Sequence, residues 1–170
     1  CAVAAIVKRQ FKTMEIVANT TDCQNGAGTG NAENGVGQII RGGDGAIITV
    51  NALRTERAAF GQALDGAIMN VVTRDMGVSI PGFTSTGAKG ISASGCRNII
   101  GNVTAIGVNP ACVKSTAFAA VNCNRRAVGP TNYDATDNIF TINSRDLGQL
   151  FREDANADRN HFIVVDSGSS

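Results

Sequence analysis

Residues 51–76 read NALRTERAAFGQALDGAIMNVVTRDM and give the clearest secondary-structure signal in the chain. Seven apolar residues recur at helical spacing, with charged residues around the rest of the surface: Leu53, Phe60, Leu64, Ala67, Ile68, Val71 and Val72. Asn51 can cap the first turn. Gly61 and Gly66 each cost a helix about 1 kcal/mol relative to alanine, so we interpret them as points of close approach to a neighbouring element. The pattern predicts one long amphipathic helix.

Three further segments have apolar residues at helical spacing. Residues 1–17 place Val3, Val7, Phe11 and Met14 on one face, and this N-terminal helix is a candidate for docking onto a neighbouring subunit. Residues 110–123 could form a helix that begins at Pro110 and reaches Cys123. Residues 144–154 predict a short helix with Ser144 as its N-cap.

Short runs of apolar and β-branched residues predict strands elsewhere. QIIR (38–41) and AIITV (46–50) flank GGDG, which is typical of a hairpin turn. The glycines at 26–37 lead into a strand with no Lys nearby, so we expect a surface loop there and no phosphate-binding loop. A second loop is expected over 77–95. Residues 96–108, 138–143 and 161–166 read as strands.

These elements predict an α+β fold for a single domain over residues 1–170. Helices and strands are mixed without regular alternation, which favours a mainly antiparallel mixed sheet, one long helix at about 51–76, an N-terminal helix and Gly-rich loops. No repeat period stands out in the sequence. No charged or proline-rich linker divides the chain.

The composition indicates a protein that associates with copies of itself. Charged residues make up 17% of the chain, against about 25% in a typical globular protein, and small neutral residues replace them. The net charge is +1 and no basic stripe is present, so nucleic acid is not expected to be a main partner. No apolar stretch reaches the length that a membrane-spanning segment needs.

Five cysteines indicate an oxidising, extracellular compartment. Cys23, Cys96, Cys112 and Cys123 are the disulfide candidates, although small buried thiols are the alternative interpretation. If a helix begins at Pro110, Cys112 and Cys123 are roughly 16 Å apart and cannot bond to each other. The remaining cysteine, Cys1, is a candidate lipid anchor or nucleophile.

The segment DANADRN (154–160) resembles a calcium-binding loop of the EF-hand type. Oxygen-bearing side chains recur at every second position, which suits a hard cation: Asp154, Asn156, Asp158 and Asn160. Arg159 stands where the loop needs glycine, and Val165 stands where it needs a bidentate glutamate. We therefore expect a polar turn, with calcium as the alternative and no other cofactor.

The last residues, FIVVDSGSS (162–170), resemble the active-site motif of the aspartic proteases. The resemblance implies that Asp166 would be one of two carboxylates that share a proton. Nothing follows the motif to build a flap or cleft, so we expect an apolar strand that runs into a small polar tail. His161, the only histidine, adjoins no recognisable nucleophile turn.

Together these observations favour a non-enzymatic structural subunit at an extracellular, cell or virion surface. We expect copies of the chain to assemble into a filament, a pilus-like fibre or a virion shell. Two alternatives belong to other classes. One is a hydrolase that uses Cys1 as an N-terminal nucleophile or Asp166 in a dimeric site, and the other is a secreted, calcium-stabilised binding module.

Overall fold

Over the part that the structure describes, the chain consists of β-strands and turns with mostly parallel pairing, so the expected α+β fold with a long helix and a mainly antiparallel sheet is wrong. The structure is a computed structural model. It describes residues 3–4, 15–21, 36–41, 44–55, 57–77, 88–109, 119–124, 126–128, 131–147, 149–153 and 157–167. These residues form sixteen strands and no helix.

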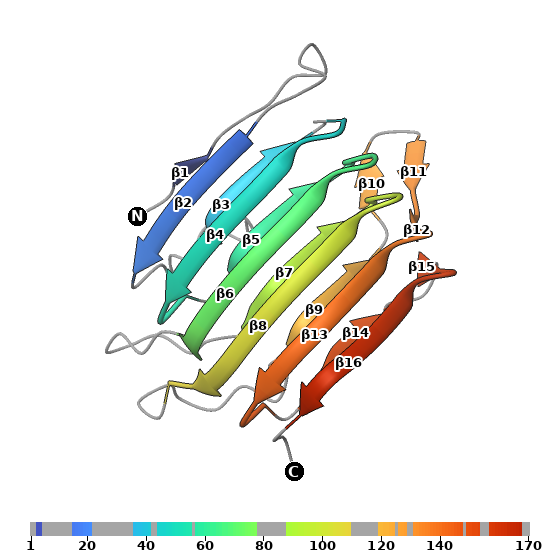
Figure 1. The fold of residues 1–170 in the computed structure, drawn as a ribbon. Coiled ribbons are helices and arrows are strands. Elements are labelled where there is room, and N and C mark those ends of the chain that lie inside the picture. The colour runs from blue at the N-terminus through green and yellow to red at the C-terminus, as the bar shows by residue number, and fades with distance from the viewer. Residues whose placement is uncertain are drawn as a thin grey trace.

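Two parallel six-stranded sheets face each other (Figure 1). Sheet A contains, in spatial order, β1 (Val3–Ala4), β3 (Val36–Arg41), β5 (Arg57–Gln62), β7 (Lys89–Ser94), β9 (Ala119–Asn124) and β14 (Phe151–Glu153). Sheet B contains β2 (Glu15–Thr21), β4 (Ile47–Leu53), β6 (Ile68–Met76), β8 (Ile100–Val108), β13 (Ile139–Arg145) and β16 (His161–Ser167). The chain passes alternately from one sheet to the other, so each pair of strands makes one coil of a parallel β-solenoid.

Four short strands lie beside the two sheets. β10 (Arg126–Val128) and β11 (Thr131–Tyr133) form an antiparallel pair, while β12 (Ala135–Thr136) and β15 (Ala157–Asp158) pair in parallel. The latter pair extends a ladder of single bridges that joins Asp44, Asp65, Arg97 and Thr136 on successive coils. This ladder marks the turn at which each coil enters sheet B.

The core lies between the two sheets. Residues of sheet B alternate between the core and the outer surface, as the burial of β4, β6 and β13 shows. The largest fully buried side chains are Ile48, Val50, Leu64, Met69, Met76, Ile91, Ile99, Phe140 and Ile142. β5 and β7 are buried on both faces, which is usual for strands of a parallel sheet.

The long helix predicted for residues 51–76 is absent. This segment contains the end of β4, all of β5 and all of β6, with turns between them. Its apolar residues fit both helical spacing and strand alternation. In β6, Met69 and Val71 enter the core while Ile68 and Val72 face outward, as strand alternation requires. Gly66 has a left-handed φ of +68°, so it forms a turn and marks no helix contact.

The other expected helices are also wrong where the structure describes them. Residues 3–4 and 15–17 of the N-terminal segment lie in β1 and β2, and residues 119–123 of the segment after Pro110 lie in β9. Residues 144–145 end β13, and residues 151–153 form β14. Residues 5–14 and 110–118 lie outside the described residues. Parallel pairing to a preceding coil stabilises these short segments as strands, although their local spacing allows a helix.

The predicted hairpin and second loop are corrected in the same way. QIIR belongs to β3 in sheet A and AIITV contributes to β4 in sheet B, so the GGDG segment leads from one sheet to the other. Part of the expected loop over 77–95 is the buried strand β7. The expected strands within 96–108, 138–143 and 161–166 are confirmed as β8, β13 and β16, but their pairing is parallel.

The same backbone conformation recurs at the turn into each strand of sheet B. The residue that follows the bridge ladder has a left-handed φ in five coils: Gly45, Gly66, Asn98, Asp137 and Arg159. In the first four of these coils its N–H donates to the carbonyl of the next coil, for example from Gly45 to Asp65 and from Gly66 to Arg97. The next residue then points into the core, and the strand begins.

Asn138 fills this inward position in the fourth of these turns and is fully buried. Its Oδ1 accepts a hydrogen bond from the Ile99 N–H at 2.9 Å, and its Nδ2 donates to the Cys96 carbonyl at 2.9 Å. Nδ2 also donates to Asn160 Oδ1 at 2.8 Å. The Asn160 amide donates in turn to the Ala135 carbonyl at 2.9 Å. These two amides therefore join three successive coils.

Replacing Asn138 with alanine should lower the free energy of unfolding by about 2–4 kcal/mol, because buried partners such as the Ile99 N–H lose their hydrogen bonds. Urea denaturation followed by circular dichroism measures the change. The matched control is Asn143→Ala, since Asn143 lies on the exposed face of β13 and should change stability by less than about 0.5 kcal/mol. Equal effects of the two substitutions would contradict the structural role of the buried amide.

Candidate functional site

The outer face of sheet B presents side chains in straight rows. Parallel pairing without offset places Ile47, Ile68, Ile100 and Ile139 in one row, between Glu15 at one end and His161 at the other. All four isoleucines are exposed. Because neighbouring strands lie about 4.8 Å apart, each row is a regular array along the solenoid axis.

Two neighbouring rows on this face each contain a hydrogen-bonded pair of asparagines. Asn51 Nδ2 donates to Asn19 Oδ1 at 3.0 Å, and Asn102 Nδ2 donates to Asn70 Oδ1 at 2.9 Å. These bonds connect side chains directly opposite each other on adjacent strands, β2 with β4 and β6 with β8. They fix the orientation of each amide group on an otherwise exposed surface.

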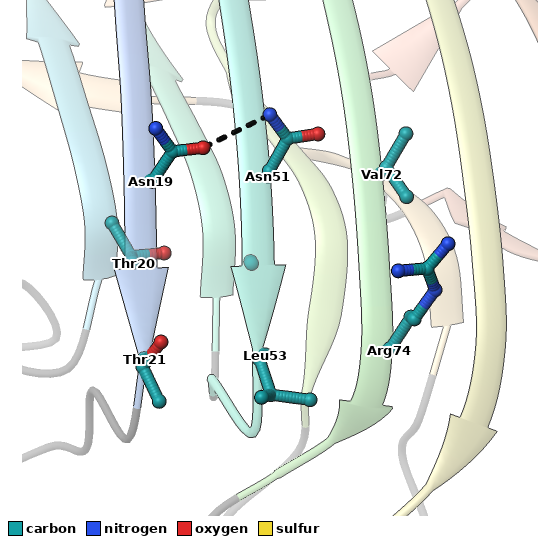
Figure 2. A pocket seen from close by; sticks show the side chains of 8 residues that line it. Asn19, Thr20, Thr21, Asn51, Leu53, Val72 and Arg74 are labelled. Carbon is teal, nitrogen blue, oxygen red and sulfur yellow. Dashed lines mark hydrogen bonds between the residues drawn. The ribbon is translucent and has the colours of Figure 1, made fainter.

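A groove of about 400 Å³ lies over β2, β4 and β6 at the carboxyl ends of these strands (Figure 2). Its lining residues are Asn19, Thr20, Thr21, Asn51, Ala52, Leu53, Val72 and Arg74. The volume falls within the range of roughly 300–1,000 Å³ that is usual for ligand-binding clefts. Thr20 and Ala52 are buried below the floor, and the other lining side chains reach the surface.

The groove combines amide, hydroxyl, aliphatic and guanidinium groups. The hydrogen bond between the two amides uses Asn51 Nδ2 and Asn19 Oδ1. Within the described chain Asn19 Nδ2 and Asn51 Oδ1 make no hydrogen bond, so a donor and an acceptor are available to a ligand. Arg74 is the one charged residue among the described lining residues, and Figure 2 shows its guanidinium group extending beside Val72. The groove is therefore polar and carries a positive charge.

The C-terminal end of the solenoid forms a second unusual surface. Val164 occupies an inward row, yet 41% of it is exposed, whereas Ile142 and Val103 in the same row are 0% and 2% exposed. Phe151 of β14 is 42% exposed and stacks on Phe162 with ring centres 4.2 Å apart. Core side chains thus reach the surface at this end, which we call the open end.

The cysteines predicted to form disulfides lie partly within the described residues. Cys96 and Cys123 are both fully buried, on the coils that contain β7 and β9. Cys1, Cys23 and Cys112 lie outside the described residues, so the disulfide pairing stays a prediction. The spacing argument that separated Cys112 from Cys123 no longer holds, because residues 119–124 are a strand.

The candidate calcium loop contributes structural contacts. Asn160 Oδ1 accepts from the backbone and side chain of Asn138, and Asp158 accepts from Arg159 at 3.1 Å. Asp154 and Asn156 lie outside the described residues. No cluster of three or more His, Cys, Asp or Glu side chains that could hold a metal is found in the part of the chain that the structure describes.

The two residues considered for hydrolysis lie on β16. His161 is exposed at the start of this strand, and Asp166 pairs with Asn143 after a shift in register. The backbone places them on the last coil, beside the open end. No helix long and apolar enough to cross a membrane is present among the described residues.

The groove residues escaped the sequence analysis. Leu53, Val72 and Arg74 fall in the helix predicted over 51–76, although ITVNAL and IMNVVTR show the strand alternation that places them on one face, and Asn19 belongs to no element predicted from the sequence. Comparison with models of protein families, curated proteins and solved structures finds no match to this chain. The site is therefore interpreted from its own geometry.

An exposed ion pair closes the last described turn of the solenoid. Arg159 donates from Nε and Nη2 to the two carboxylate oxygens of Asp137, each at 2.7 Å. This hydrogen bonding lowers the pKa of Asp137 below its ordinary value of 3.8, and it raises the pKa of Arg159. A carboxyl whose pKa is lowered by folding stabilises the fold at pH values above its pKa in the unfolded state. This stabilisation is lost as the pH falls through the lower pKa of the folded state.

In the Asp137→Asn variant, the free energy of unfolding should therefore fall less steeply with decreasing pH below 3.8 than in the wild type. Asparagine tolerates the left-handed φ of +58° at this position, so the change chiefly removes the charge. Urea midpoints measured at neutral pH and at a series of pH values below 3.8 test this. Arg159→Gln, which removes the same pair from the other side, should give a similar slope, and an unchanged slope in both variants would contradict the assignment.

Proposed function

We propose that this chain is a non-enzymatic structural subunit whose copies assemble end to end into an extracellular filament or fibre. The single observation that carries the proposal is the exposure of Phe151 and Val164 on the last described coil, where they present apolar surface of a kind that the preceding coils bury. Solenoid proteins need a cap or a neighbour over such an end. A second copy of this chain is the occupant that we infer.

The topology supports addition along the solenoid axis. Sheet A runs from β1 to β14 and sheet B runs from β2 to β16, so both sheets begin at one end of the rod and finish at the other (Figure 1). A copy translated along this axis would place β2 beside β16 and β1 beside β14. Both sheets would then continue across the contact through strand edges that pair on one side only among the described residues.

The outer rows match across such a contact. Glu15 and His161 terminate the same row, so an imidazole N–H of one copy would meet the carboxylate of the next. Val17 and Ile163 terminate the adjacent row, and both are exposed apolar residues. Because the two ends differ, the contact is heterologous and does not close on itself, which favours a filament or fibre over a closed shell.

A charge exchange tests this arrangement. His161→Glu should place like charges opposite each other and reduce assembly, whereas His161→Glu combined with Glu15→Lys should restore it. Sedimentation velocity over a concentration series, with electron microscopy of the largest species, gives the readout. Ile100→Lys, in the middle of the same row, is the control and should not change assembly.

Further outcomes separate assembly from folding. Circular dichroism melts of each variant show whether the solenoid is intact. Val164→Asp, at the open end, should also leave shorter particles, because it buries a charge in the contact. Wild-type protein that stays monomeric at every concentration, or a charge exchange that restores nothing, would overturn the proposal.

A further inference from the structure

We propose that the groove over β2, β4 and β6 binds an acidic polysaccharide, with the chain lying along the solenoid axis. The inference is independent of self-assembly, because every residue that it uses belongs to one copy. It rests on the arrangement of hydrogen-bonding groups, the charge of the groove and the continuation of its rows across the sheet.

The direction of the occupant follows from the rows that line the groove. Asn19, Asn51 and Val72 are register partners on three adjacent strands, and Thr21, Leu53 and Arg74 form the next row. A ligand that crosses the strands meets one such position about every 4.8 Å. The first row continues over the sheet with Thr104, the register partner of Val72, and then with Asn143, the register partner of Thr104. The surface therefore suits an extended polymer.

The hydrogen-bonding groups suit hydroxyl-rich rings. The Asn51 Nδ2 group donates to Asn19 Oδ1 and holds both amides in fixed positions (Figure 2). This leaves Asn51 Oδ1 as an acceptor and Asn19 Nδ2 as a donor for the ligand. A sugar hydroxyl both donates and accepts, so neighbouring hydroxyl groups can satisfy both amides. Val72 and Leu53 offer methyl groups to the C–H faces of a sugar ring.

The charge of the groove selects an anionic chain. Arg74 is exposed, and no acidic residue is among the described residues that line the groove. A guanidinium group binds a carboxylate through two parallel hydrogen bonds. Arg145 occupies the same row two strands further on, at about 10 Å, so a polymer with regularly spaced carboxylates meets a second cation.

The lining fits a glycan better than other polymers. Peptide-binding sites usually rely on buried aromatic or arginine anchors in deep pockets, and single-stranded nucleic acids stack on aromatic rings. The described lining contains no aromatic residue. Uronic acid residues supply hydroxyl groups, aliphatic ring faces and a carboxylate in one repeating unit, and each of these groups has a counterpart in the groove.

Isothermal titration calorimetry of the full chain with oligogalacturonate tests the inference. Wild-type protein should bind this probe, and the same oligosaccharide with its carboxylates converted to amides should bind at least about tenfold more weakly. Arg74→Gln should weaken binding of oligogalacturonate to a similar extent. Arg74→Lys should recover only part of it, since an ammonium group cannot form the paired bonds.

Matched variants separate the site from general charge effects. Arg97→Gln removes the same charge at the turn before β8, where Arg97 pairs with Asp65 at 3.2 Å, and should leave binding unchanged. Asn51→Ala should weaken the binding of both the charged and the amidated oligosaccharide, because it removes the amide that contacts a sugar hydroxyl. Equal binding of the two probes, an unaffected Arg74→Gln variant, preference for a single-stranded polynucleotide, or no binding would overturn the proposal.

Discussion

The solenoid depends on one backbone constraint, the left-handed turn that leads each coil into sheet B. In five coils the residue after the bridge ladder adopts a positive φ, and in the first four of these its N–H reaches the carbonyl of the next coil. Glycine meets this requirement without steric cost at Gly45 and Gly66, while Asn98 and Asp137 belong to the types that tolerate it best. Because each turn occupies the same place, the following strands start level with one another and their side chains form straight rows.

Level strands impose a second requirement, which is that polar groups inside the turns must be satisfied from neighbouring coils. Asn138 and Asn160 meet it with side-chain amides that donate hydrogen bonds to the carbonyls of Cys96 and Ala135, respectively. Packing is equally restricted where coils are close. A Cβ atom at Gly101 would lie 2.3 Å from the Phe140 ring, so the large side chain on β13 needs the glycine beside it on β8. Size and polarity are therefore matched between coils.

The same regularity gives the molecule two surfaces with different character. Along the rod, the outer face of sheet B presents amides, hydroxyls and methyl groups at a fixed spacing, with Arg74 and Arg145 on alternate strands. At the open end, Phe151 and Val164 are partly exposed, whereas the residues of the same inward rows on the preceding coils are buried. The proposed end-to-end contact would use the surface at the open end, and the proposed ligand would lie along the outer face of sheet B.

The sequence by itself determined the strands that consist of short runs of apolar and β-branched residues, such as NIFTIN and HFIVVD. It also indicated a surface made largely of small neutral residues. It did not determine the pairing. Residues 51–76 satisfy both helical and strand periods, and only the neighbouring coils make the strand arrangement favourable. The repeat was hidden because its turn positions, Asp44, Asp65, Arg97, Thr136 and Asp158, are 21, 32, 39 and 22 residues apart. Segments of unequal length between strands leave the stacked rungs unchanged in space. Hydrogen bonding between coils, which no local pattern records, thus decided the parallel solenoid and brought Asn19, Asn51 and Arg74 to one groove.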